Sequence, residues 1–228
     1  MDNEIYTDGE YLRKNTTWDV EHSPWKAKQI KKILVQNKIT PQTVCEVGCG
    51  AGEILNQLYI QMPEDVSFIG YDISPQAINL CKQRQKDRLD YFQKDLILED
   101  VFFDVVLAID VFEHVEDYIG FLKKLRHRGE YKIFHIPLDI SIQSVFRMKP
   151  ILDLRENVGH LHYFTKDTAL QTLYYAGYEI IDYFYTPKGI DIPGHSALFK
   201  IPRKVMFKFN QDLAVRILGG YSLLVLAK

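Results

Sequence analysis

The fold of this chain is decided by the stretch Val44-Cys45-Glu46-Val47-Gly48-Cys49-Gly50-Ala51-Gly52. An apolar strand runs here into three glycines at alternate positions, and an amphipathic segment over 52–62 follows them. Glycine adopts positive φ and lets a ligand approach the backbone where any Cβ would collide. A plain tight turn is the alternative interpretation. The strand before the glycines and the helix after them favour a ligand-binding loop at the end of a strand.

Outward from this loop, short apolar runs alternate with longer amphipathic segments, which predicts βαβ units and a mostly parallel sheet. Helices are expected over 24–37, 52–62, 75–86, 117–127, 166–176 and 203–218. The seven predicted strands are Thr43–Val47, Val66–Tyr71, Leu89–Gln93, Phe103–Ile109, Tyr131–Ile136, Tyr178–Tyr185 and Ser222–Ala227.

Three segments do not fit a minimal α/β domain. Residues 1–40 are predicted to form an N-terminal helical lid, followed by one domain over 41–228 with insertions at about 138–164 and 186–220. In this fold class such connections follow the carboxyl ends of strands, where ligands bind. Both insertions are therefore expected near an active site. The 203–218 helix could pack on the sheet, close as a lid, form a dimer face or lie on a membrane surface.

The composition is that of a single large globular domain. The 228 residues are 46% hydrophobic and 25% charged, with a net charge of −2 from 28 basic and 30 acidic residues. This balance makes nucleic acid an unlikely partner. The N-terminus has no apolar signal region, and no stretch approaches the roughly 20 apolar residues of a membrane span. The three cysteines form no CxxC pair, so reduced thiols and a cytoplasmic location are expected.

Glu46 discriminates between nucleotide-like ligands. A dinucleotide fingerprint has GxGxxG spacing and places a pyrophosphate at a helix N-terminus, whereas the spacing here is GxGxG. A carboxylate beside a pyrophosphate would repel it, but it suits an ammonium and a sulfonium. The loop therefore favours S-adenosylmethionine (SAM) over NAD.

Two further carboxylates follow the next strands. Asp72 ends the second strand, 24 residues after Gly48, where a carboxylate can accept hydrogen bonds from a ribose diol. Asp95 follows the third strand, at a level where a carboxylate can accept from an adenine amino group. A helix cap and a surface turn are the respective alternatives.

At this point the sequence resembles the class I SAM-dependent methyltransferases, closest to the ubiquinone-biosynthesis O-methyltransferase branch. The motifs that carry the resemblance, all within about 40–137, are ValCysGluValGlyCysGlyAlaGly, TyrAspIleSer, LysAsp and PheAspValValLeuAlaIleAspValPheGluHisVal. The resemblance implies a Rossmann-like seven-stranded sheet with its last strand antiparallel. The predicted cofactor-binding residues are Glu46, Gly48, Gly50, Asp72, Ile73, Asp95, Leu96, Asp110 and Val111.

The run after the fourth strand, Asp110-Val-Phe-Glu113-His114, resembles a metal-ligand set of some related O-methyltransferases and of small-RNA 3′-end methyltransferases. Asp stands where the latter have Glu. The later run His160-Leu-His-Tyr-Phe-Thr-Lys would supply the remaining histidine. Asp110, Glu113, His114 and His160 are therefore a candidate site for a divalent metal. Structural roles for the two histidines are the alternative.

His135 ends the fifth strand and is a candidate base facing the acceptor, or else a packed histidine; His114 and His160 are the other candidate catalytic residues. Taken together, the sequence predicts SN2 transfer of a methyl group from SAM to an oxygen, less readily a nitrogen, of a small molecule with an aromatic or sugar hydroxyl. The alternatives are a catalytically silent SAM-binding partner subunit, a methyltransferase acting on an RNA 3′ end and an NAD-dependent oxidoreductase. The oligomeric state stays open.

Overall fold

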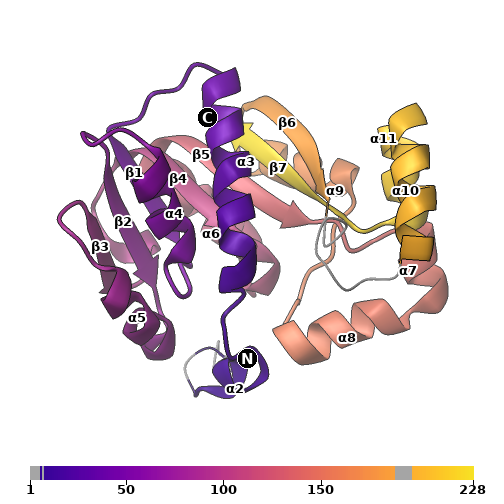
Figure 1. Ribbon diagram of the computed structural model, residues 1–228, viewed down its shortest axis with the longest axis horizontal. Coiled ribbons are helices and arrows are strands. Elements are labelled where there is room, and N and C mark those ends of the chain that lie inside the picture. The colour runs from indigo at the N-terminus through magenta and orange to yellow at the C-terminus, as the bar shows by residue number, and fades with distance from the viewer. Residues whose placement is uncertain (1–5, 7, 188–196) are drawn as a thin grey trace.

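A computed structural model of the chain describes residues 6, 8–187 and 197–228. Its centre is a seven-stranded sheet in the order β3-β2-β1-β4-β5-β7-β6 (Figure 1). The strands are β1 (Thr43–Val47), β2 (Ser67–Asp72), β3 (Leu89–Gln93), β4 (Phe103–Ile109), β5 (Gly129–Pro137), β6 (Ile180–Pro187) and β7 (Tyr221–Ala227). All seven predicted strands are present, within about two residues at each end.

The pairing is parallel from β3 through β5, and β7 runs antiparallel to both of its neighbours. This confirms the predicted Rossmann-like sheet with an antiparallel last strand. Buried on both faces, the central strands are nearly continuous apolar runs, as is typical of parallel sheets. The register pairs Ile109 of β4 with His135 of β5, which brings Asp110 beside His135 at the carboxyl edge.

Helices cover both faces of the sheet. On one side lie α3 (Ser23–Gln36), α4 (Glu53–Gln61) and α5 (Pro75–Cys81), and on the other lie α6 (Tyr118–Leu125) and α9 (Lys166–Tyr175). Pro75 opens α5 behind Ser74, whose Oγ accepts from the backbone N–H of Ala77, a standard N-cap. These two layers hold the strand ends in fixed positions.

The predicted N-terminal lid divides into two parts. The helix α3 belongs to the core, because Ala27, Ile30 and Ile33 are fully buried against α4 and the sheet. Only the chain before it, with α2 (Glu10–Lys14) and the short helix η1 (Val20–His22), lies outside the two layers (Figure 1). A lid role is therefore confined to residues before α3.

The two insertions are helical where the structure describes them. Residues 138–164 contain α7 (Ile142–Arg147) and α8 (Lys149–Val158). The single helix predicted over 203–218 is instead a pair, α10 (Ala197–Phe209) and α11 (Gln211–Leu218). The chain breaks at Asn210 because its extended backbone and its side chain, which accepts from the Leu213 N–H, cap α11. The stretch 188–196 of the second insertion lies outside the described residues.

Candidate functional site

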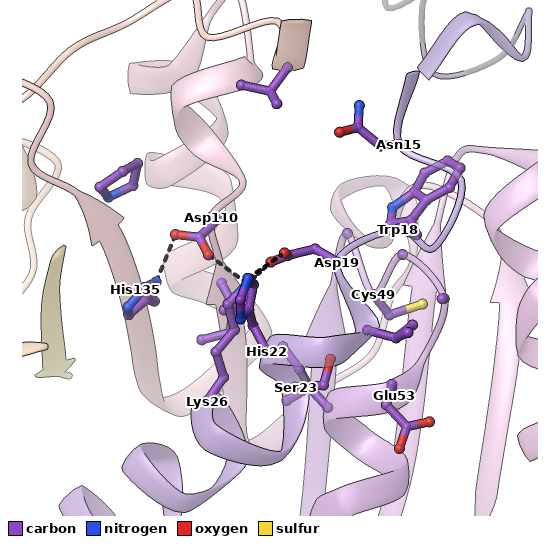
Figure 2. Close-up of a pocket in the computed structure, with 18 of the residues that line it drawn as sticks. Asn15, Trp18, Asp19, His22, Ser23, Lys26, Cys49, Glu53, Asp110 and His135 are labelled. Atoms are coloured by element: carbon purple, nitrogen blue, oxygen red, sulfur yellow. Dashed lines mark hydrogen bonds and ion pairs between the residues drawn. The ribbon is translucent and has the colours of Figure 1, made fainter. Parts of the chain in front are cut away.

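A cavity of about 770 Å³ opens at the carboxyl edge of the sheet. The loop after β1 and the N-terminal segment, which is the chain before α3, line it on two sides (Figure 2). Leu154 and Val158 of α8 also line it. One space therefore joins the glycine loop, through Glu46 and Gly50, to His114 and His160 at the other end.

The glycine loop has the conformation that its sequence predicts. Gly48 and Gly50 adopt φ values of 64° and 54°, which side chains disfavour. A Cβ at Gly50 would lie 2.6 Å from Cδ1 of Trp18, whose ring covers the loop from the N-terminal segment. The Trp18 ring thus occupies the position that a Cβ of residue 50 would take, and it covers the loop.

Glu46 is the buried polar group at the base of this space. Its side chain is 1% exposed, and its Oε2 has no hydrogen-bond partner among the residues that the structure describes. Burial raises the pKa of Glu46 well above its usual range, although Lys26 opposes the shift. A buried acceptor without a donor destabilises a protein unless a ligand supplies one. The ammonium of SAM is such a donor, so the residues present fit this cofactor.

Asp72 joins the glycine loop to the second strand. Its Oδ2 accepts from the Gly50 N–H at 2.9 Å, and its Oδ1 accepts from the Ser74 N–H at 2.8 Å. Burial raises the pKa of Asp72 to about 6, against the lowering effect of these backbone hydrogen bonds. Each carboxylate oxygen keeps a second lone pair with which it can accept from a hydroxyl.

The other residues predicted to bind the cofactor differ in what they offer. Asp95 is exposed and its Oδ1 accepts from the Ile97 N–H at 3.0 Å, which caps the short helix η3 (Leu96–Leu98). The side chain of Leu96 is fully buried in the core, so only its backbone can face a ligand. Ile73 is 38% exposed, and Val111 packs over the Cα of Gly48.

Asp110 is the centre of a charged network at the carboxyl edge (Figure 2). Its Oδ1 lies 2.7 Å from Nδ1 of His135, and its Oδ2 lies 3.0 Å from Nζ of Lys26. The same Lys26 Nζ lies 3.0 Å from Oδ2 of Asp19 in the N-terminal segment. Burial alone would raise the pKa of Asp110, but His135 and Lys26 hold it below its usual range. Asp110 also has a left-handed φ of 53°, a conformation that non-glycine residues adopt mainly where surrounding contacts impose it.

His135 is placed to brace Asp110. Its Nε2 lies 2.9 Å from Oγ1 of Thr186 on β6. When Nδ1 donates a hydrogen bond to Asp110, Nε2 accepts one from the Thr186 hydroxyl. Both ring nitrogens therefore have protein partners. Of the two roles expected for His135, these contacts favour the packed histidine over a base that faces an acceptor.

A second cluster lies at the far end of the cavity. Ligand atoms of Glu113, His114 and His160 lie within 4.8 Å of one another, all three residues being largely buried. Asp110 is not part of this group, because its carboxylate binds Lys26 and His135. The structure thus brings together three of the four predicted metal-binding residues.

Both histidines of the cluster are held through Nδ1. His160 Nδ1 lies 2.7 Å from Oδ2 of Asp139, and both side chains are less than 8% exposed. His114 Nδ1 lies 2.8 Å from the Tyr6 hydroxyl and 3.2 Å from the Gly159 carbonyl. With Nδ1 engaged in this way, each Nε2 is the nitrogen left for a proton or a metal ion. Burial, with the neighbouring His160, lowers the pKa of His114 to about 4, so this ring is neutral at neutral pH.

Sequence reasoning missed four residues of the site: Tyr6, Asp19, Lys26 and Asp139. Three of them come from the N-terminal part of the chain, which carries no recognisable motif, and Asp139 opens the first insertion. The two tryptophans were the available signal, since Trp18 before α3 covers the glycine loop and Trp25 of α3 packs against His135. Nothing in local sequence predicts which strand ends such residues reach.

Comparison with known proteins gives a family and a set of structural neighbours. A family model described as "Methyltransferase domain" matches residues 22–183. The solved structures similar to the chain include magnesium protoporphyrin IX methyltransferase (ChlM) from Synechocystis PCC 6803 with bound SAH, at 16% identity and a TM-score of 0.61, over 90% of this chain and 82% of that one.

Two further solved structures have the same fold. The plantazolicin methyltransferase BpumL in complex with SAH is 17% identical, with a TM-score of 0.64 over 99% of this chain and 92% of that one. The N-methyltransferase NodS from Bradyrhizobium japonicum WM9 in complex with SAH is 14% identical, with a TM-score of 0.56 over 89% and 84%. Identities this low show the fold alone. No curated protein matches the chain in sequence.

Proposed function

This chain belongs to the methyltransferase domain family, and we propose that it transfers the methyl group of SAM to an oxygen of a small-molecule acceptor. The observation that carries the proposal is the single cavity of about 770 Å³ that joins the glycine loop to His160. A donor and an acceptor can occupy this space together. SAM, when bound, supplies the methyl group on a positively charged sulfur.

The cofactor end of the cavity is the half that contains Glu46. Oε2 of its buried carboxyl lacks a donor within the described part of the chain, and the ammonium of SAM would provide one and favour the ionised form of Glu46. Gly48 and Gly50 admit the amino-acid part of SAM against the backbone, while Asp72 accepts from the ribose hydroxyls. The Trp18 ring excludes water from above.

The acceptor end is the half that contains His160. Asp139 holds Nδ1 of His160 in its protonated form, so Nε2 is the basic nitrogen that takes the proton from the acceptor hydroxyl. As the O–H proton moves to Nε2, the oxygen forms its bond to the methyl carbon and the carbon–sulfur bond breaks, which leaves the neutral thioether SAH. The proton then passes from His160 to water. Asp139 is a positioning residue in this scheme.

A divalent cation on Glu113, His114 and His160 is a second way to activate the same hydroxyl, favoured by the proximity of their ligand atoms. Such an ion would lower the pKa of a bound acceptor, and Asp139 would orient one of its ligands. Removal of metal distinguishes the two mechanisms. Full activity after dialysis against a chelator assigns His160 as the base, whereas loss that added Mg²⁺ or Mn²⁺ restores assigns the metal.

The proposal is tested by incubating the chain with methyl-labelled SAM and a panel of phenols, sugars and amines, with products identified by mass spectrometry. We expect a methylated hydroxyl compound, and a fall of about 10²–10⁴-fold in kcat for His160→Ala, the range that general-base catalysis contributes. His127→Ala is the matched control, because this exposed histidine lies just before β5, at the opposite end of that strand from the site.

Other outcomes of the same assay would replace the proposal. If the label appears on RNA 3′ ends and on no small molecule, the chain is an RNA 3′-end methyltransferase. SAM binding without turnover of any acceptor would leave a SAM-binding partner subunit, and binding of NAD in place of SAM would contradict the cofactor.

A further inference from the structure

The helices of the two insertions carry an unusual number of exposed apolar side chains. Phe146 and Phe209 are 89% and 87% exposed, more than any other large apolar residue that the structure describes. Scattered exposed apolar residues are normal, but a concentration of them marks an interaction surface. The set on these helices and the turn between α7 and α8 is Ile142, Val145, Phe146, Met148, Leu152, Ile201, Val205, Phe209 and Leu213.

These helices gather at one end of the molecule, beyond the antiparallel part of the sheet (Figure 1). The packing of α7 against both α8 and α11, and of α10 against α11, makes them one body. A side-chain bond supports this arrangement, since Nη2 of Arg203 on α10 donates to Oε1 of Gln143 on α7 at 3.2 Å. We name the exposed surface of α7, α8, α10 and α11 the insertion face.

The insertion face is also basic. Its four helices contain eight lysines and arginines against three acidic residues, whereas the whole chain has 28 basic and 30 acidic residues. Two of the three acidic residues are already bonded to lysines, Asp153 to Lys149 and Asp212 to Lys166. Lys149 is thereby also paired, and Arg216 is paired with Asp167 of α9. Arg147, Arg155 and Lys208 are exposed and form no ion pair with a residue that the structure describes, and they lie on the same helices as the apolar side chains.

A small polar hollow lies between these helices. Its volume is about 160 Å³, and its lining includes Arg147, Arg203, Ser141 and the backbone of Gly219 and Gly220. Asp139 also lines the hollow, the Gly219 N–H donates to the Val215 carbonyl and the Ser141 hydroxyl caps α7. The two guanidinium groups are therefore the donors that the hollow offers to a phosphate oxygen. The hollow thus matches the charge of a phospholipid headgroup.

We propose that the insertion face binds the surface of a membrane that contains anionic phospholipids. Helices that alternate Phe, Leu and Ile with Lys and Arg, without length or apolarity to span a bilayer, lie at the headgroup level with their apolar side chains inserted. No helix in the described part of the chain is long and apolar enough to cross a membrane, and surface binding requires none.

The position of the face connects membrane binding with the proposed function. Leu154 of α8 lines both the polar hollow and the main cavity, and Val158 also lines the main cavity. An acceptor at the bilayer surface would reach His160 along this wall. This step alone rests on the proposed function, and it makes the acceptor an amphipathic molecule with a hydroxyl headgroup.

The test is co-sedimentation of the full chain with vesicles of phosphatidylcholine alone and of phosphatidylcholine with about one third phosphatidylglycerol. We expect binding to the anionic vesicles, weakened by raised salt. Arg155→Glu/Lys208→Glu is expected to reduce this binding at least about tenfold, since each basic residue near an anionic surface adds attraction. Phe146→Ser/Phe209→Ser is expected to reduce it similarly by removing the inserted side chains.

Matched controls alter the same residue types elsewhere. Phe102→Ser removes another exposed phenylalanine, and Lys82→Glu/Lys124→Glu reverses two exposed lysines, one directly after α5 and one on α6. Both variants should bind vesicles as the original chain does. Equal binding to both vesicle types, no binding, or equal loss in the controls would overturn the proposal. A further outcome would also overturn it: the chain binds no vesicles, light scattering shows that it is a dimer, and Phe146→Ser/Phe209→Ser dissociates that dimer. Vesicle binding requires no methyl transfer, so its failure leaves the proposed function standing.

Discussion

At the scale of single residues, Asp72 makes the cofactor site sensitive to pH. Ribose hydroxyls donate to the ionised carboxylate, and burial raises its pKa to about 6 in the free protein. Because SAM prefers the ionised form, its affinity should fall as pH falls through this value, by about tenfold between pH 7 and 5. Calorimetric titration of SAH at several pH values measures this dependence.

Replacement of the carboxylate tests the same assignment. Asp72→Ala should weaken SAH binding by about tenfold or more at neutral pH, since a charge-assisted hydrogen bond contributes about 1.5–3 kcal/mol. It should also flatten the dependence on pH. If the folded Asp72→Ala protein binds SAH with unchanged affinity, Asp72 does not contact the cofactor.

Gly50 gives a second prediction at this scale. Gly50→Ala adds a Cβ 2.6 Å from Cδ1 of Trp18, at a left-handed φ of 54°, in the loop proposed to bind the cofactor. SAH binding should fall at least about tenfold while the circular dichroism spectrum is retained, because the strain is local. Gly9→Ala is the control, with a similar φ of 85° and a nearest atom 3.6 Å away. In Gly50→Ala/Trp18→Ala the loss should persist, because the cofactor itself meets the new Cβ; recovery there would assign the effect to Trp18.

At the scale of elements, Lys26 connects the N-terminal segment to β4. Its ammonium bridges Asp19 and Asp110, and although burial alone would lower its pKa, these two carboxylates raise it. SAH should slow hydrogen exchange in residues 8–22 and 138–164, as closure over a ligand excludes water. Lys26→Met leaves two carboxylates facing each other, so it should abolish the protection of 8–22 and spare that of 138–164.

Lys26→Arg keeps the charge and serves as the control, with protection of both segments retained. If Lys26→Met behaves as Lys26→Arg does, the bridge has no part in closure. If SAH changes exchange in neither segment, residues 8–22 lose their proposed role as a lid, and 138–164 take no part in closure.

At the scale of the whole molecule, the cofactor contributes to folding because it binds strand ends that only the native sheet brings together. SAH at about a hundredfold excess over its Kd should stabilise the native state by about 2.7 kcal/mol, which corresponds to a rise in Tm of roughly 5–10 °C for a chain of this length. Glu46→Gln should reduce the rise, since a neutral amide binds an ammonium more weakly. If scanning calorimetry shows an equal rise in Tm for Glu46→Gln, the ammonium of the cofactor does not bind Glu46.

The sequence by itself determined the sheet and the loop after β1. Alternating apolar runs and helix caps such as Ser74 are local signals, and the glycines at positions 48 and 50 report a backbone conformation that needs no distant partner. Even the departures are local in origin, as at Asn210, whose side chain caps a new helix where one continuous helix was predicted.

Only the tertiary structure decided what the polar side chains near the cavity do. His135 and His160 both appeared as possible bases, but Thr186 takes the free nitrogen of the first, while Asp139 leaves Nε2 of the second available. Asp110 was separated from Glu113 in the same way, by Lys26 of α3. A side chain's role depends on which group meets each of its atoms, and these partners lie 21 to 84 residues away in the sequence. Strand pairing and helix packing bring them together, which no local pattern encodes.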